Sequence, residues 1–258
     1  MTPEPASLAW TATLITLALT TQYVSGVIGM GYGTILTPVL ILLGVNPLNA
    51  VSSVVVSQLV GNSVLSLMHH RLGNADLRPG GEESKRAIIL GVSGVVGPFA
   101  AVLLMLRMPA SLLKAYVAIL MLSMSVLVVL SRRVRAKYST KKLFLIAAIA
   151  SFNKGLTGGG YGPVVTAGQL ILGINPKSAV AVTSMAEFIT EVTAVTLYGL
   201  TGLLNPALIV PMTAGTVLSA PLVAKTVKVA PNTTLRRVMA AGMTLLALAV
   251  LVKALAVL

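Results

Sequence analysis

The sequence predicts an all-α polytopic membrane protein built from two repeats of inverted topology. Three observations predict this class: an apolar composition, apolar segments of membrane-spanning length, and a duplicated glycine motif. Of the 258 residues, 56% are hydrophobic and only 10% are charged, and the mean hydropathy is +0.93. In soluble domains about a quarter of the residues are charged. The apolar runs are continuous rather than alternating, which disfavours a β-barrel.

Ten apolar segments follow one another along the chain. Two of them, 34–44 and 163–172, hold only about eleven residues, or about 16 Å of helix, and we interpret them as half-helices. Each follows a glycine motif and ends at a Gly-x-Asn-Pro turn, at Gly44–Pro47 and Gly173–Pro176. The other eight are long enough to cross a hydrocarbon core of about 30 Å, and they cover 8–28, 48–69, 87–106, 110–130, 142–157, 178–198, 206–224 and 237–257.

The two halves of the chain are copies of one another. SGVIGMGYGTILTPVLILLGVNP, residues 25–47, matches KGLTGGGYGPVVTAGQLILGINP, residues 154–176, at a constant offset of 129. We therefore divide the chain into a first transmembrane repeat, 1–129, and a second, 130–258, each with four long spans and one half-helix. Inverted repeats of this kind build alternating-access transporters, whose sites lie near mid-membrane at broken helices.

The basic residues gather in three loops, 71–86, 131–142 and 225–237. Basic loops face the cytoplasm. Placing all three there inverts the second repeat relative to the first and puts both termini on the extracytoplasmic side. The net charge of +13 then reflects this bias and the attraction of anionic lipid, so no nucleic-acid partner is expected.

No catalytic constellation stands out in the sequence. It has no cysteine, which excludes thiolate metal sites and cysteine nucleophiles. It also has no HExxH motif, Walker loop or nucleophile elbow. We therefore expect no catalytic residues, no metal site and no cofactor.

The duplicated Gly-x-Gly-Tyr-Gly motif predicts a substrate site. Glycines let backbone N–H groups approach a ligand closely, and the half-helix that follows directs the positive end of its dipole at the same place. Such an end attracts anions, whereas the alternative is that the glycines only allow close helix packing. The motif residues expected to bind substrate are Gly29, Gly31, Tyr32, Gly33, Gly158, Gly159, Gly160, Tyr161 and Gly162.

Polar side chains within the apolar spans extend the candidate site. Ionisable groups at membrane depth are costly and usually functional. Lys154, the repeat partner of Ser25, could bind an anionic oxygen, pair with a buried carboxylate or snorkel to the interface. Thr183 and Ser184 could line the path, or bond a carbonyl one turn back.

Two carboxylates are expected to couple transport to an ion. Glu187 and Glu191 share one helix face, and their repeat partners Gln58 and Asn62 are also polar. We assign Gln58 and Asn62 to substrate binding. A protonated glutamate could donate a hydrogen bond to an anion; alternatively the pair holds Na⁺, neutralises Lys154 or makes a structural hydrogen bond.

These motifs resemble those of the sulfite exporter TauE/SafE family of membrane permeases. The first repeat departs from the family pattern, with Gly-Met-Gly where a glycine triplet is usual and with Val54-Val55 in place of the Thr-Ser pair. The resemblance implies movement of sulfite or of organosulfonates such as sulfoacetate across the bacterial inner membrane. The resemblance to the family rests on Gly29–Gly33, Thr37-Pro38, Asn46-Pro47, Ala50-Val51, Gly158–Gly162, Asn175-Pro176, Ala179-Val180 and Thr183-Ser184.

Together these features predict a secondary transporter that exports small sulfur-containing anions, with proton coupling through Glu187 or Glu191. A passive anion channel and an H⁺- or Na⁺-linked cation transporter using the same glutamates are the alternatives. The expected partners are the anionic substrate, the lipid bilayer and H⁺ or Na⁺, and the sequence leaves a homodimer open.

Overall fold

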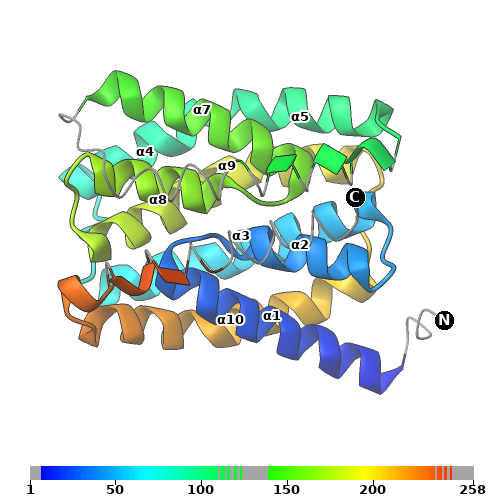
Figure 1. Ribbon diagram of the computed structural model, residues 1–258, viewed down its shortest axis with the longest axis horizontal. Helices are drawn as coiled ribbons and strands as arrows, with labels where there is room; N and C mark the ends of the chain where they lie inside the picture. The colour runs from blue at the N-terminus through cyan, green and yellow to red at the C-terminus, as the bar shows by residue number, and fades with distance from the viewer. Residues whose placement is uncertain are drawn as a thin grey trace.

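The computed structural model is helical throughout the part of the chain that it describes (Figure 1). The expected spans 110–130 and 237–257, and most of the basic loop 131–142, lie largely outside the described residues. The structure describes residues 7–109, 111–113, 115, 116, 119, 120, 123, 139–235, 237–239, 241, 242 and 245.

Among the described helices, α1, α3, α9 and α10 are each long and apolar enough to cross a membrane. The consecutive helices α4 and α5 are long and apolar enough to do so together. The half-helices expected after the glycine motifs are α2 and α8, of 11 residues each. Adding 129 to the bounds of α2 and α3 gives the bounds of α8 and α9. The helices are α1 (Leu8–Ile28), α2 (Tyr32–Leu42), α3 (Pro47–Arg71), α4 (Glu82–Ser93), α5 (Val96–Arg107), α7 (Thr140–Thr157), α8 (Tyr161–Ile171), α9 (Pro176–Leu200) and α10 (Pro206–Val229).

Local sequence explains where the helices of both repeats end and begin. α1 ends at Gly29, with φ of 70°, and α7 ends at Gly158, with φ of 72°; this left-handed conformation favours glycine. α3 and α9 each begin with a proline, which is suited to the first helical turn. The side chains of Asn46 and Asn175 cap them, each accepting a hydrogen bond of 2.9 Å from the backbone N–H two residues on.

The span expected over 87–106 lies within Glu82–Arg107, which is long and apolar enough to cross a membrane, but a short break divides it into two helices, α4 and α5. Pro98 has no N–H to donate to the carbonyl of Gly94, and its ring would collide with that carbonyl in a continuous helix. The backbone instead tightens before the proline, where Gly94 N bonds Gly91 O and Val95 N bonds Val92 O. The break is therefore a local consequence of the proline.

The helices form tiers around a central pair, α3 and α9, which pack against each other. α1 lies along α10 on one side of this pair, and α7 lies along α4 and α5 on the other (Figure 1). In the same view α2 and α8 start near the middle and run toward opposite ends, and α3 and α9 run in opposite directions. This arrangement brings the start of both half-helices to the centre of the bundle.

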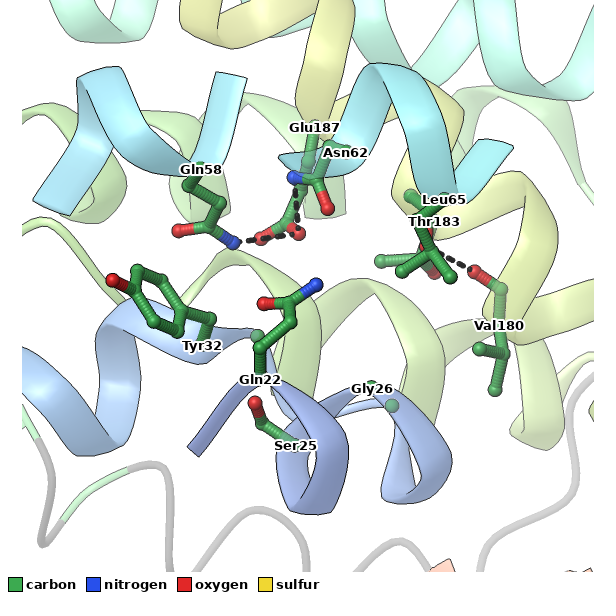
Figure 2. Close-up of a pocket in the computed structure, with 13 residues that line it drawn as sticks. Gln22, Ser25, Gly26, Tyr32, Gln58, Asn62, Leu65, Val180, Thr183 and Glu187 are labelled. Atoms are coloured by element: carbon green, nitrogen blue, oxygen red, sulfur yellow. Dashed lines mark hydrogen bonds between the residues drawn. The ribbon is translucent and has the colours of Figure 1, made fainter. Parts of the chain in front are cut away.

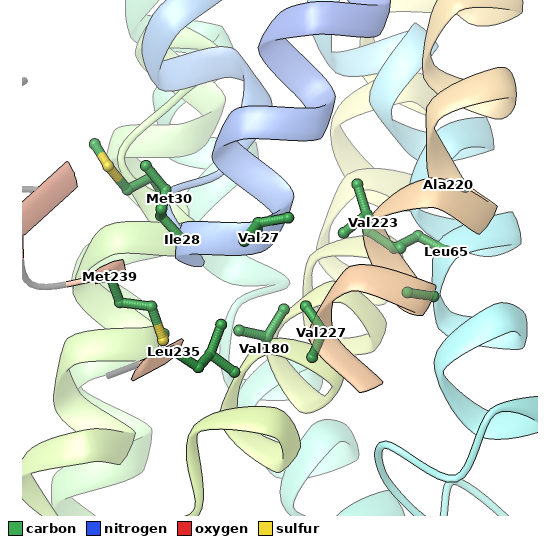
Figure 3. Packing of buried hydrophobic residues seen from close by; sticks show 11 residues of the cluster. Val27, Ile28, Met30, Leu65, Val180, Ala220, Val223, Val227, Leu235 and Met239 are labelled. Atoms are coloured by element: carbon green, nitrogen blue, oxygen red, sulfur yellow. The ribbon is translucent and has the colours of Figure 1, made fainter. Parts of the chain in front are cut away.

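An apolar cluster closes one side of this centre. Figure 3 shows Val27 of α1 close to Val223 and Val227 of α10, with Leu65 and Val180 in the same cluster. All five are buried. Leu65 and Val180 also line the small cavity described below, so this packing separates the polar centre from the end of α10.

Candidate functional site

Lys154 lies at the centre of the protein and pairs with both buried glutamates. It belongs to the last turn of α7 and is 1% exposed. Its Nζ lies 2.7 Å from Glu191 Oε1 and 3.3 Å from Glu187 Oε1. Of the contacts that the sequence left open for Lys154, the structure has the ion pair with buried carboxylates. A buried charge requires such partners, because its desolvation is expensive.

Two amide side chains of the first repeat complete the hydrogen bonding of these carboxylates. Gln58 Nε2 donates to Glu187 Oε2 at 3.1 Å, and Asn62 Nδ2 donates to the same oxygen at 3.2 Å (Figure 2). Asn62 Nδ2 also donates to Glu191 Oε2 at 3.2 Å. Gln58 and Glu187, like Asn62 and Glu191, are 129 residues apart. Positions that correspond in the two repeats therefore touch across the α3–α9 interface.

The two glycine motifs pack directly against each other. A Cβ on Gly33 would lie 1.7 Å from the carbonyl oxygen of Gly158, and one on Gly162 would lie 2.4 Å from Gly31 N. This is the close packing that the sequence offered as an alternative to ligand binding. In this conformation the motifs leave no space between them, and their role in binding substrate stays a prediction.

A carboxylate of the protein itself lies at the start of the first half-helix. Gly31 is the N-cap residue of α2, and a Cβ on it would lie 3.1 Å from Glu187 Oε1. The N-terminal end of a helix favours a negative charge. Glu187 thus combines contact with Lys154 and proximity to a half-helix terminus, which are the interactions expected for a bound anion.

A small cavity adjoins this centre on the side of the first repeat. Water-sized molecules have about 20 Å³ available for their centres, which is room for about one water. Eight of its lining residues were predicted as site residues, namely Gly29, Gly31, Tyr32, Gln58, Asn62, Thr183, Ser184 and Glu187. Lys154, Glu191 and the glycine motif of the second repeat, Gly158–Gly162, do not line it.

The motif tyrosines make structural contacts. Tyr32 Oη lies 3.2 Å from Ser57 Oγ, and Tyr161 Oη donates to the carbonyl oxygen of Leu90 at 3.1 Å. Both rings are buried. Only Tyr32 lines the cavity, so the two tyrosines are not equivalent in this conformation.

The hydroxyls of α9 that line the cavity are also engaged within the protein. Ser184 Oγ donates to the carbonyl oxygen of Val180, one turn back, at 3.1 Å. Thr183 Oγ1 accepts a 2.8 Å hydrogen bond from Gln169 Nε2. The bond made by Ser184 is the alternative that the sequence analysis offered for this residue.

Comparison with known proteins agrees with these features. The profile of the sulfite exporter TauE/SafE family matches residues 14–250. The chain belongs to this family. It is also 26% identical over 190 residues to the probable membrane transporter protein YtnM of Bacillus subtilis (strain 168), a match covering 69% of this chain and 60% of YtnM. No solved structure matches it significantly. The family and the apolar helices identify a multi-pass membrane protein.

Sequence reasoning missed part of the polar wall of this TauE/SafE family member. Gln22 and Ser25 of α1 line the cavity and are 2% and 0% exposed. Gln22 is a polar residue inside an otherwise apolar span, three residues before the repeat partner of Lys154. That pattern was a usable signal, because the two side chains share one face of a helix. Gly26, Leu65 and Val180 complete the lining and carried no comparable signal.

Proposed function

We propose that this transporter exports small sulfur-containing anions, such as sulfite or organosulfonates like sulfoacetate, across the bacterial inner membrane. The observation that carries the proposal is the buried ion pair of Lys154 with Glu187, whose carboxylate lies against the glycine turn that starts α2. A buried ammonium and a half-helix terminus both favour an anion. The family match supports sulfur oxyanions as the substrate class.

Glu187 acts in this proposal as an internal substitute for the substrate. Its carboxylate contacts Lys154 and lies against Gly31. An anion can take over these contacts only when the negative charge of the carboxylate is removed or compensated. Binding of H⁺ or Na⁺ at Glu187 or Glu191 would do so, and this couples the anion to a cation.

Transport then requires a conformational change around the centre. The packed glycine motifs and a cavity with room for about one water correspond to an occluded state. The opposite directions of α3 and α9 and of α2 and α8 (Figure 1) support inverted repeats that rock against each other. In this topology loops 71–86, 131–142 and 225–237 are cytoplasmic, and both termini are extracytoplasmic.

The membrane potential favours export. With the inside negative, each net negative charge that moves outward gains about 2.3 kcal/mol per 100 mV. A divalent anion that leaves with one monovalent cation retains one net negative charge. Its export is therefore still driven by the potential.

The test is anion flux in liposomes. The purified protein is reconstituted, an inside-negative potential is imposed with and without a pH gradient, and flux of labelled sulfite and of a labelled sulfonate is measured. We expect outward flux that Lys154→Ala abolishes and that Glu187→Gln retains with a weakened response to pH. Lys85→Ala, an exposed lysine of α4, is the matched control.

Two results would overturn the proposal. One is the absence of flux of any sulfur anion by a monodisperse, folded protein. The other is loss of transport in Glu187→Gln with little change in Lys154→Ala, which is the pattern expected of a cation transporter. Size-exclusion chromatography and circular dichroism of each variant separate lost transport from failure to fold.

A further inference from the structure

Two sources of negative charge border the cavity. It adjoins the C-terminal end of α1, with Ser25 and Gly26 of the last turn in its wall. The C-terminal end of a helix carries a partial negative charge. The carboxylate-bearing side chain of Glu187 forms another part of the wall. The partial positive charge at the start of α2, where Gly31 and Tyr32 also line the cavity, lies against the carboxylate of Glu187.

Two buried amide oxygens in this wall have no hydrogen-bond donor among the described residues. They are Oε1 of Gln22 and Oε1 of Gln58, on side chains that are 2% and 1% exposed. The Nε2 of Gln58 donates to Glu187, which orients its amide and leaves the oxygen for another partner. Figure 2 shows Gln22 extending from α1 toward Gln58 and Glu187. Buried unpaired oxygens are costly, and a cation would satisfy both.

The second repeat shows what belongs at the corresponding position. At the end of α7 the repeat partner of Ser25 is Lys154, whose ammonium is bound by Glu187 and Glu191. Ser25 carries a neutral hydroxyl and supplies no charge. The first repeat therefore has a helix terminus, oxygen atoms and a cavity where the second repeat has a tethered cation.

In its fully ionised state the centre also lacks one positive partner. With both carboxylates ionised, Glu187 and Glu191 contribute two negative charges and Lys154 contributes one positive charge, which leaves a net charge of −1. A buried charge needs compensation, and one monovalent cation gives it, whereas a divalent ion would leave +1. Oxygen ligands suit hard cations rather than transition metals.

We propose that the cavity binds Na⁺ through the side-chain oxygens of Gln22, Gln58 and Glu187. The ion does in the first repeat what the ammonium of Lys154 does in the second. The role of Na⁺ as coupling ion rests on the proposed anion transport, but its binding does not.

The test measures binding without transport. Purified protein in detergent is titrated with radiolabelled Na⁺, and its thermal unfolding is followed in NaCl and in choline chloride at equal ionic strength. We expect saturable binding, displaced by Na⁺ more readily than by K⁺, and a higher unfolding temperature in NaCl. No anion substrate or membrane potential is present, so this result stands or falls separately from the flux experiment.

Two variants locate the ion. Gln22→Met removes one ligand oxygen and should weaken binding roughly tenfold or more. Ser25→Lys should abolish Na⁺ binding, because its ammonium takes the position of the ion, and size-exclusion chromatography and circular dichroism check that the larger side chain leaves the protein folded. Ser219→Ala removes a buried hydroxyl of α10 that does not line the cavity, and it should bind Na⁺ as the unmodified protein does.

Three outcomes would overturn the inference. The first is the absence of saturable Na⁺ binding by the folded protein. The second is binding that persists in both cavity variants. The third is an unfolding temperature that ignores Na⁺ and rises as the pH falls, which would mean that a proton balances the centre.

Discussion

The C-terminal ends of α1 and α7 have the same backbone and different chemistry. Both helices end at a glycine in the left-handed conformation, Gly29 and Gly158, and both are followed by an 11-residue half-helix. The last turn of α1 contains Ser25 beside a cavity, whereas that of α7 contains Lys154 in a buried ion pair. Duplication thus supplies a common scaffold, and single side chains give each copy its own function.

The facing residue pairs on α3 and α9 also combine a shared backbone with different side chains in the two repeats. The first repeat contributes the amides Gln58 and Asn62, and the second contributes the carboxylates Glu187 and Glu191. An amide can donate a hydrogen bond, whereas an ionised carboxylate only accepts. Identical carboxylates in both repeats would place four acceptors around one ammonium. The asymmetry is what allows corresponding residues to touch at the interface.

The largest expected loss of stability comes from replacing Lys154, the charged member of the Ser25–Lys154 pair. Lys154→Met leaves two buried carboxylates without their cation and should lower the free energy of unfolding by about 3–5 kcal/mol. Ser25→Ala at the corresponding position removes no charge and should change it far less. Chemical denaturation in detergent, followed by circular dichroism, measures both.

Removing a carboxylate as well gives an internal check on this prediction. Lys154→Met combined with Glu191→Gln should regain part of the lost stability, because it reduces the uncompensated charge. A Lys154→Met protein as stable as Ser25→Ala would mean that the ion pair contributes nothing to the folded state.

A smaller effect is expected where the two glycine motifs meet. Gly33→Ala places a Cβ 1.7 Å from the carbonyl oxygen of Gly158, so the backbones must separate. Overpacking of this kind typically costs about 1–3 kcal/mol. Gly162→Ala, its repeat partner, should behave similarly because its Cβ would lie 2.4 Å from Gly31 N.

Gly199→Ala in α9 is the matched control for these glycines. Its Cβ would have only one neighbour within 4 Å, at 3.9 Å, and alanine favours a helix over glycine. In detergent, Gly199→Ala should have a higher unfolding temperature than either motif variant. If all three unfold at the same temperature, the motifs are not tightly packed in solution.

The smallest expected effect compares another pair of corresponding positions, Tyr198 and His69. Tyr198 Oη donates to the carbonyl oxygen of Gly155 at 2.8 Å, whereas His69 Nδ1 pairs with Asn74 Nδ2 at 2.8 Å. Tyr198→Phe should lower the free energy of unfolding by about 1 kcal/mol, since it leaves a buried carbonyl unpaired. Tyr23→Phe, whose hydroxyl is exposed, is the control, and an equal loss in both would show that Tyr198 has no special role.

Several features of this protein follow from its sequence because they depend on local chemistry. Continuous apolar runs predict membrane-spanning helices, and glycines followed by Asn-Pro turns predict the short helices α2 and α8 and their caps. The offset of 129 identifies the residue pairs that correspond, including Gln58 with Glu187. The family also follows from these motifs and is confirmed by the profile match. The break between α4 and α5 is equally local, because it follows from Pro98.

The tertiary structure alone decided which of the alternative contacts these residues make. Lys154 could have bound an anion, paired or snorkelled, and it pairs because α7 and α9 bring it within 2.7 Å of Glu191. The glycine motifs pack on each other because α2 and α8 meet at the centre. The cavity beside Gln22 exists because helices from both repeats converge there without filling it. Such contacts join residues far apart in the chain, and no local pattern of residues specifies them.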